Sequence, residues 1–508
     1  ANIDNILKFT SLYKDARLFK LEQNYRSTQT IVKAANSLIE KNREQIRKEV
    51  FSENDKGEPI TVFNAYSDVE EGEIVANKIA QLRTKKGYSY DEFAVLYRTN
   101  AQSRIFEEAL RKRGVPYRIY GGLSFYQRKE VKDVISYLRL IVNPHDEEAF
   151  KRVINYPARG IGDTTLNKLV VAATDHNVSL WTVLNDPIGY ALPVNNGMAK
   201  KLSDFRELIS GFIERNVKLS AEEIAAAVVK ESGIVSTLFQ DRSVEGISKQ
   251  ENLQELLKGI AEFCEIRREE GMEHVSLADF LSEVSLLTDQ DNDKEEQANK
   301  VTMMTVHAAK GLEFRNVFVV GLEEDLFPSA MSKDNPRAVE EERRLFYVAI
   351  TRAEENCVLT HARSRYRNGQ STMCSPSRFL KDIDPKYIYT LADAVTTDGL
   401  LATRRSSVFQ QPKAMEGEAY VSPVAQAVGR QARLTRMETA SLSPAPSSSS
   451  APALSGLHVG AKVRHDRFGE GEVTAIEGEG GNAKATVSFA HFGQKQLLLK
   501  FARLTIVE

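Results

Sequence analysis

The sequence has few cysteines, no long apolar run and almost no net charge, and each of these absences excludes a class of protein. Its three cysteines, Cys264, Cys357 and Cys374, show no CxxC spacing, and its eight histidines form no ligand pairs. We therefore expect reduced thiols and no metal site. The strongest apolar run, Val317 to Leu322, has the length of a strand and is too short to span a membrane. No signal peptide is visible, and together with the reduced thiols this favours a cytoplasmic protein.

The net charge of −2 creates no global basic field that would attract nucleic acid, so any DNA contact must depend on local clusters. A hydrophobic content of 42% and a charged content of 27% are typical of a globular chain. The length of 508 residues predicts three or four domains.

Residues 1 to about 125 alternate strand-like and helical segments, which is the rhythm of a parallel α/β sheet. From about 126 to 295 helix follows helix, and strand signals then return. The economical interpretation is an α/β domain interrupted by a helical insertion. The expected strands are Ile60 to Asn64, Phe93 to Tyr97, Val301 to Thr305 and Val317 to Val320, and the expected helices outside the insertion are Ile31 to Ile39, Glu70 to Arg83, Ser103 to Arg113 and about Glu340 to Thr351.

The C-terminal part changes character twice. Residues 441–455, SLSPAPSSSSAPALS, are too poor in apolar residues to bury a core, and we expect a disordered linker over 396–455. Residues 456–508 have the size and glycine punctuation of a small β-barrel. Its expected strands are Ala461 to Arg464, Gly471 to Ile476, Ala485 to Phe489 and Gln496 to Phe501.

The segment Asn24-Tyr25-Arg26-Ser27-Thr28 follows an apolar run that we interpret as a strand and opens a helix that Ser27 or Thr28 could cap. An arginine there faces whatever lies at the strand's end, where ligands bind in α/β sheets. The alternative is a capped helix with a surface arginine, and the segment alone favours that alternative.

The segment TVHAAKGLEF, residues 305–314, lies between two expected strands. Lys310 could meet a phosphate, and Glu313 could accept hydrogen bonds from a ribose. The alternative is a charged connector in which His307 is incidental. That alternative is less favoured, because the alanines and glycine let a backbone approach closely.

The segment EEERRLFYVAITR, residues 340–352, is expected to be a helix with glutamates in its first turn. Arg352 projects from its end, as a guanidinium does when it stabilises charge in phosphoryl transfer. A solvated helix with i,i+4 pairs explains Arg343 and Arg344 but not the position of Arg352.

Within the insertion, Arg159 is followed by Gly160, Ile161 and Gly162 and then by Asp163. Such a turn leaves backbone N–H groups at a helix N-terminus, where they could hold a DNA phosphate. A plain interhelical turn is an equally good interpretation.

Together, NYRST, TVHAAKGLEF and EEERRLFYVAITRAEE resemble successive later motifs of superfamily I DNA helicases of the UvrD, Rep and PcrA kind. Their order and their spacing around a helical insertion also match. YRTNAQSR, PYRIYGGLSFYQRKEVKDVISYLRL and YPARGIGDTT resemble the same family's second lobe and insertion, so the resemblance runs nearly continuously to about Leu380.

The resemblance implies definite nucleotide contacts. Tyr25 would stack on the base, and Arg26 would contact the γ-phosphate. Glu313 would bind the ribose, and Arg352 would be the arginine finger. The implied ligands are ATP and Mg²⁺.

The resemblance also implies contacts to DNA. Thr99, Asn100 and His307 would track the single strand, and Lys310 would tie its loop to the DNA or to the nucleotide side. Gly160, Ile161 and Gly162 would grip the duplex. Tyr366 would be the aromatic of the strand-separating hairpin, although it stands two positions from the usual place.

By the same resemblance, residues 1–20 would end a first motor lobe of the RecA-like, P-loop type. A second RecA-like lobe would comprise 21–125 and 296–395, interrupted by the insertion at 126–295. The dipeptide Gly-Lys, which a P-loop requires, occurs nowhere in the sequence. The phosphate-binding first lobe is therefore expected to be left off, and with it the Mg²⁺ ligands.

The implied activity is that of an ATP-dependent 3′-to-5′ DNA helicase and translocase of DNA repair or replication, bacterial and nucleoid-associated, and inactive without the first lobe. Its DNA would be single strands and duplex junctions. GxxVxHxxFGxGxV, in residues 456–473, resembles a Tudor- or SH3-like barrel that docks on RNA polymerase. Two alternatives stay open: the helicase half of a helicase–nuclease, although 381–508 has no acidic cluster, and a fragment acting only as a binding module for RNA polymerase or DNA.

Overall fold

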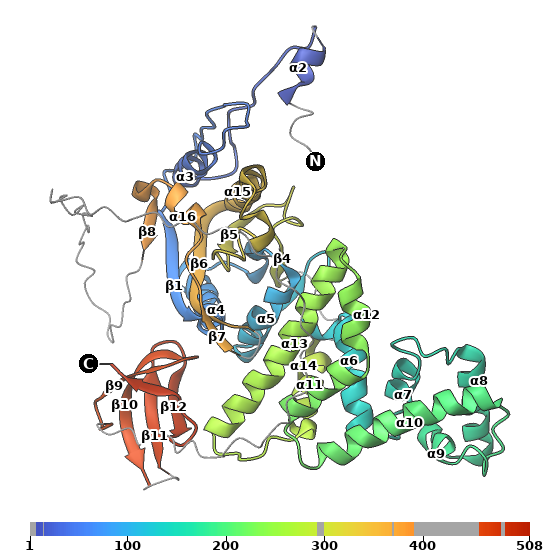
Figure 1. Ribbon diagram of the computed structural model, residues 1–508. Helices are drawn as coiled ribbons and strands as arrows, with labels where there is room; N and C mark the ends of the chain where they lie inside the picture. The colour runs from blue at the N-terminus through green and yellow to red at the C-terminus, as the bar shows by residue number, and fades with distance from the viewer. Residues whose placement is uncertain are drawn as a thin grey trace, which may run out of the picture. The chain divides into compact units, whose positions relative to one another are not determined.

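The computed structural model describes residues 7–13, 15–291, 299–367, 370–390, 457–478 and 483–507. The expected linker over 396–455 lies outside these residues. Three parts follow one another: a sheet domain, a helical insertion within it, and a C-terminal barrel (Figure 1). Within the described residues, no helix has the length and apolar content needed to cross a bilayer.

The sheet domain is built on a mainly parallel sheet whose strands run in the order β3-β4-β2-β5-β6-β1-β8, with β7 pairing antiparallel to β6. Its central strands β4, β2 and β5 come from chain segments on either side of the insertion. The strands are β1 Ile60–Ser67, β2 Phe93–Tyr97, β3 Tyr117–Ile119, β4 Val301–Thr305, β5 Phe314–Val319, β6 Ala353–Arg367, β7 Gln370–Met373 and β8 Ile388–Thr390.

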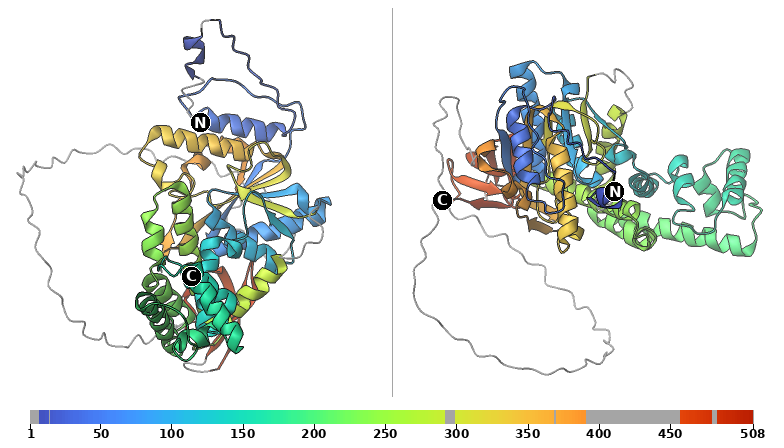
Figure 2. Two further views of the ribbon diagram at one scale, coloured as in Figure 1. Left: turned by 90° about the vertical axis from the view of Figure 1, so that its right-hand side faces the viewer. Right: turned by 90° about the horizontal axis from the view of Figure 1, so that it is seen from above.

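Helices cover both faces of this sheet, because alternate residues of each strand point to opposite sides. Ala94 and Leu96 of β2 belong to one core, which α3, α15 and α16 complete. Phe93 and Val95 belong to the other core, with α4 and α5. Figure 2 shows α15 along one border of the sheet. The helices are α3 Gln29–Ile39, α4 Asp68–Lys86, α5 Ser103–Lys112, α15 Pro336–Ile350 and α16 Arg378–Asp382, and the short α2 Phe9–Leu12 precedes them.

The insertion leaves the sheet after β3 and returns to it at β4, and these two strands are parallel neighbours. Its helices share one large apolar core that includes Trp181, the single tryptophan of the chain. They are α6 Lys129–Val142, α7 Glu147–Val153, α8 Asp163–His176, α9 Leu180–Asn185, α10 Asn196–Asn216, α11 Ala221–Glu231, α12 Ile234–Gln240, α13 Val244–Glu269 and α14 Leu277–Asp291.

The barrel is a five-stranded antiparallel sheet in the order β12-β11-β10-β9-β13. Four strands were predicted within a few residues, and the closing strand, β13, was missed. The strands are β9 Lys462–His465, β10 Gly469–Glu477, β11 Lys484–Phe489, β12 Gly493–Leu498 and β13 Leu504–Ile506.

Three local predictions were wrong. Within 7–13 and 15–23, the part described before Asn24, there is no strand, and the backbone makes only an isolated bridge between Gln23 and Phe51. Thr28 is the N-cap of α3, but its side chain makes no capping hydrogen bond. Helix α15 begins at Pro336 and is capped by Asn335, so the three glutamates of EEERR lie beyond its first turn and gain little from the helix dipole.

Candidate functional site

The turn that carries Tyr25 and Arg26 is fixed to the start of β6. The Asn24 Oδ1 atom accepts hydrogen bonds from the backbone N–H groups of Arg26 at 2.8 Å and Ser27 at 2.9 Å. The Ser27 hydroxyl donates to the Ala353 carbonyl at 2.7 Å. The Asn24 bonds fix the shape of the turn and the Ser27 bond fixes its position, so the turn holds the side chains of Tyr25 and Arg26 on one side of the sheet edge.

Arg26 and Glu313, which are distant in sequence, form an ion pair at this edge. The Nε atom of Arg26 lies 2.5 Å from a carboxylate oxygen of Glu313, and Nη1 donates to the Thr351 carbonyl at 3.3 Å. The two side chains are 29% and 55% exposed. An ion pair this exposed contributes about 0–1 kcal/mol, so a bound anion can readily replace Glu313 as the partner of Arg26.

Arg352 lies beside the same pair, just after the C-terminal end of α15. It donates to the carbonyls of Val348 at 3.1 Å and Leu312 at 3.0 Å. Burial lowers the pKa of Arg352, and the positive charge of Arg26 lowers it further. Two guanidinium groups this close together favour the binding of a polyanion, which neutralises their mutual repulsion.

An open hollow of about 550 Å³ lies in front of these groups, lined by Asn24, Tyr25, Arg26, Glu313 and Glu354. Tyr25 is 79% exposed and has a free ring face. Glu354 was missed by sequence reasoning, although it follows Arg352 closely in the same motif. Burial and then the charge of Glu313 raise the pKa of Glu354. Three of the four residues that the resemblance linked to a nucleotide, Tyr25, Arg26 and Glu313, therefore line one hollow, and Arg352 lies behind it, bonded to the Leu312 carbonyl next to Glu313.

This hollow is at the amino ends of β5 and β6, since Glu313 directly precedes β5 and Arg352 directly precedes β6. The expectation that Arg26 would face a ligand at the carboxyl end of a strand was therefore wrong. The physical reason is that NYRST bonds to the first residues of β6 and does not follow a strand of this sheet.

The four residues assigned to the single strand and to its loop lie at the opposite edge of the sheet. Thr99 and Asn100 follow β2, and His307 and Lys310 follow the parallel neighbour β4. The N–H group of Val306 donates to the Tyr97 carbonyl at 2.9 Å, which holds the two loops together. Parallel strands end at the same edge, so the four side chains belong to one region.

Two further contacts shape that region. Arg98 forms a two-pronged pair with Glu342 of α15, with a shortest distance of 2.7 Å. Burial and then Arg98 lower the pKa of His307, which favours a neutral imidazole. Arg128, at the start of the insertion, donates to the Asn100 carbonyl at 2.9 Å and so connects this loop to the insertion.

In the insertion, Gly160 has φ +71°, which requires glycine, and Gly162 is the N-cap of α8. Ile161 differs from the expectation: its side chain is 1% exposed in the insertion core, and its N–H group donates to Asn155 Oδ1 at 3.0 Å. Ile161 therefore holds the turn and offers no group to a phosphate, because packing and an asparagine already satisfy it.

The hairpin of β6 and β7 pairs Tyr366 with Ser371 through the backbone, while the Tyr366 side chain lies outside what the structure describes. The neighbouring Arg365 is buried and forms ion pairs with Glu71 and Glu323. Buried ion pairs therefore hold the hairpin where it leaves the sheet.

Two family models match. The UvrD-like helicase C-terminal domain matches residues 19–364, and the PcrA/UvrD tudor domain matches residues 459–505. The chain belongs to the UvrD-like helicase family. The tudor match covers nearly all of the barrel, and the UvrD-like match covers the whole insertion and most of the sheet domain, ending within β6.

Curated relatives match this UvrD-like chain over its full length. The ATP-dependent DNA helicase PcrA of Leuconostoc citreum is 36% identical over 100% of this chain and 65% of its own length. DNA helicase II of Escherichia coli is 36% identical over 100% of this chain and 64% of its own length. PcrA of Staphylococcus aureus is 38% identical over 99% and 64%. The chain thus spans about 64% of the length of the relatives it matches.

A solved C-terminal domain of a possible DNA helicase from a Lactobacillus overlaps 72% of this chain and 98% of its own, at 11% identity and a TM-score of 0.28, too low to compare folds.

Among the residues that the structure describes, no cluster of histidine, cysteine, aspartate and glutamate could hold a metal ion.

Proposed function

We propose that this chain is the DNA- and nucleotide-responding part of an ATP-dependent 3′-to-5′ DNA translocase and helicase that serves DNA repair or replication. The observation that carries the proposal is that Tyr25, Arg26 and Glu313 line one hollow, with Arg352 held close beside the Arg26–Glu313 pair. An exposed ring, a carboxylate and two guanidiniums match the base, the ribose and the phosphates of a nucleotide.

The chain's residues would act on ATP together with a phosphate-binding lobe that supplies the P-loop and the Mg²⁺ ligands. ATP would supply the γ-phosphoryl group, whose developing charge needs cations nearby. Arg26 would pair with the γ-phosphate in place of Glu313. The released carboxylate of Glu313 would then accept a hydrogen bond from a ribose hydroxyl. Arg352, held by two carbonyls at the end of α15, would approach as the lobes close.

The loop of residues 306–313 would transmit this change to DNA. It runs from the carboxyl end of β4, with His307 and Lys310, to the amino end of β5, with Glu313. A displacement of Glu313 at the amino end of β5 would therefore be passed along these eight residues to Lys310 and His307 at the carboxyl end of β4. Cycles of closing and opening would advance the chain along one strand.

The decisive experiment joins this chain to the phosphate-binding lobe of a relative and measures DNA-stimulated ATP hydrolysis and unwinding. Activity that needs both parts supports the proposal. Unwinding that survives Glu313→Ala and Arg26→Ala would overturn it.

The barrel would recruit RNA polymerase, as the resemblance implies. Arg464 and Lys495 are exposed and are the candidate contacts on the barrel, whereas His465 and Arg467 are only 1% and 7% exposed. A capture assay with RNA polymerase tests the assignment through Lys495→Glu. The alternative, a binding module without motor activity, predicts capture and DNA binding but no ATP hydrolysis even after the lobes are joined.

A further inference from the structure

The barrel belongs to the same compact unit as the sheet domain and the insertion, and it contacts both. On one side, the hydroxyl of Ser67, the N-cap of α4, donates to the Arg467 carbonyl at 2.6 Å. On the other side, the guanidinium of Arg467 donates to Glu265 of α13 at 2.9 Å. One turn of the barrel, between β9 and β10, thus touches the sheet domain and the insertion at once.

His465 is the buried centre of this contact. Its Nδ1 atom accepts hydrogen bonds from the N–H groups of Arg467 at 3.1 Å and Phe468 at 3.3 Å. The proton is therefore on Nε2, which donates to Glu269 at 2.9 Å. Both side chains are 1% exposed. The imidazole thereby fixes the shape of the turn and bonds it to α13.

The contact is complementary in charge but incompletely satisfied. Arg467 Nη1 and Glu269 Oε2 lie 3.6 Å apart, and each is buried without a hydrogen-bond partner among the described residues. A cavity of about 40 Å³ lies beside them, lined in part by Ser67, Glu262 and His465. Dehydrated charges without full hydrogen bonding recover little of their desolvation cost, so such an interface is easily opened.

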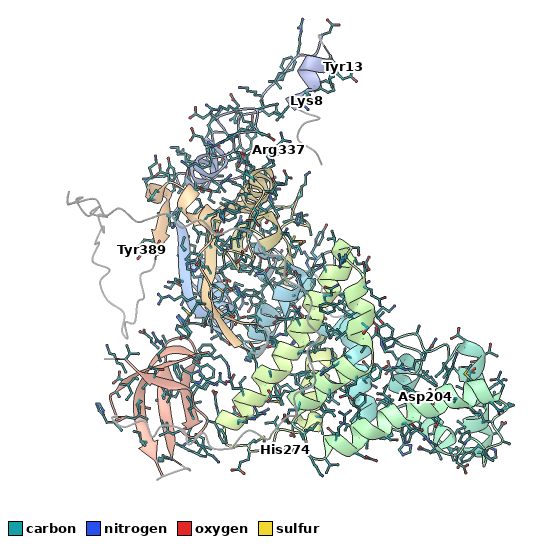
Figure 3. The ribbon with its side chains drawn as sticks, viewed as in Figure 1. Lys8, Tyr13, Asp204, His274, Arg337 and Tyr389 are labelled. Carbon is teal, nitrogen blue, oxygen red and sulfur yellow. The ribbon has the colours of Figure 1, made fainter. Side chains whose placement is uncertain are left out.

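The periphery of the contact repeats the same charge pattern in exposed positions. Lys500 lies 3.6 Å from Glu273, and Arg503 lies 3.3 Å from Glu265. His274, labelled in Figure 3, marks the turn that follows α13 on this side. Exposed pairs of this kind orient an interface and contribute little to its strength.

We propose that the barrel is a releasable latch. Docked, its β9–β10 turn bridges the N-terminal end of α4 and α13, beside the direct ion pairs of Lys258 with Asp68 and of Glu262 with Arg104 that join α13 to the sheet domain. Released, it exposes the turn from His465 to Phe468 while those ion pairs keep the insertion in place, so a macromolecule that binds this turn and the docked state exclude each other. The proposal depends on the barrel interface and not on the proposed helicase activity.

Hydrogen exchange of the 508-residue chain tests the latch from both sides. Glu265→Arg, on α13, should speed amide exchange about tenfold or more in the unaltered barrel segment 463–470, because like charges now face each other. Arg467→Glu should do the same in α13, at 262–269. The exchanged pair Glu265→Arg with Arg467→Glu should restore protection in both segments.

Lys462→Glu is the matched control, because it makes the same charge reversal at an exposed position of β9, the strand that leads into the turn, and should leave both segments protected. Loss of protection in β11 of the Arg467→Glu protein would mean that the barrel itself unfolds; the Glu265→Arg protein, with an intact barrel, then decides alone. Unchanged exchange of 463–470 in Glu265→Arg would overturn the latch.

Discussion

Replacing Arg365 with methionine removes the cation from a buried cluster and should destabilise the sheet domain strongly. Arg365 is 8% exposed, and its partners Glu71 and Glu323 are both fully buried, at 2.7 Å and 2.5 Å. Methionine keeps much of the side chain's length but leaves two carboxylates without their cation. Removing one partner of a buried pair costs about 3–5 kcal/mol.

The loss should depend on pH. Burial raises the pKa of Glu71 above its usual range, and Arg365 opposes this rise. Without Arg365 the pKa of Glu71 rises further. When a carboxyl group has a higher pKa in the folded state than in the unfolded state, the free energy of unfolding falls as pH increases above the unfolded pKa. The difference between variant and wild type should therefore be larger at pH 8 than at pH 5.

Native-state hydrogen exchange in β1 and β6, corrected for intrinsic rates, measures this loss. A loss of about 3 kcal/mol speeds exchange by more than two powers of ten. Trp181 fluorescence reports on the insertion core and should change less. Arg378→Met is the control, since Arg378 and Glu324 form the same two-pronged pair at 40% and 18% exposure and should lose at most about 1 kcal/mol. Equal losses in the two variants, or a loss independent of pH, would refute the reasoning.

Three further predictions concern function. The 508-residue chain alone should show no DNA-stimulated ATP hydrolysis above background, because it has no Gly-Lys pair; phosphate release measures this, and robust turnover would contradict it. Once a phosphate-binding lobe is joined, Arg352→Ala should lower kcat by about three powers of ten while DNA affinity persists; the reverse pattern would mean that Arg352 contacts DNA. Gly162→Ala adds a methyl group in open space and should weaken binding to duplex junctions but not to single strands, as fluorescence anisotropy can show. Equal losses on both DNAs would indicate a misfolded insertion.

The sequence predicted β2 and β4 to the residue, because both are short apolar runs buried on two faces. It did not predict β6, although this strand is central to the sheet. The reason is chemical: β6 carries Thr360, His361, Ser364 and Arg365, all buried, and a run of polar residues does not resemble a buried strand. The partner of Thr360 comes from α4, that of Ser364 from β1 and that of Arg365 from the chain after β5, and only the fold brings these segments together.

The same limit applies to the barrel. His465 and Arg467 are polar residues near glycines, a pattern typical of an exposed turn. Their burial results from Glu265 and Glu269, about 200 residues earlier, on a helix that no local pattern links to the barrel. Tertiary ion pairs of this kind cannot be inferred from one sequence.

The placement of the nucleotide candidates shows what spacing alone conceals. Lys310 and Glu313 are separated by two residues, and a motif so compact suggests one shared site. However, β4 and β5 are parallel and are separated by β2, so the loop between them must cross from the carboxyl edge to the amino edge of the sheet. Lys310 therefore begins the crossing on the side of Thr99, and Glu313 completes it beside Arg26. Because Val306 and Ala309 are buried in the core under this loop, the crossing is packed and not slack. A packed segment transmits a displacement at one end to the other, and this makes the loop a direct physical connection between the two candidate sites.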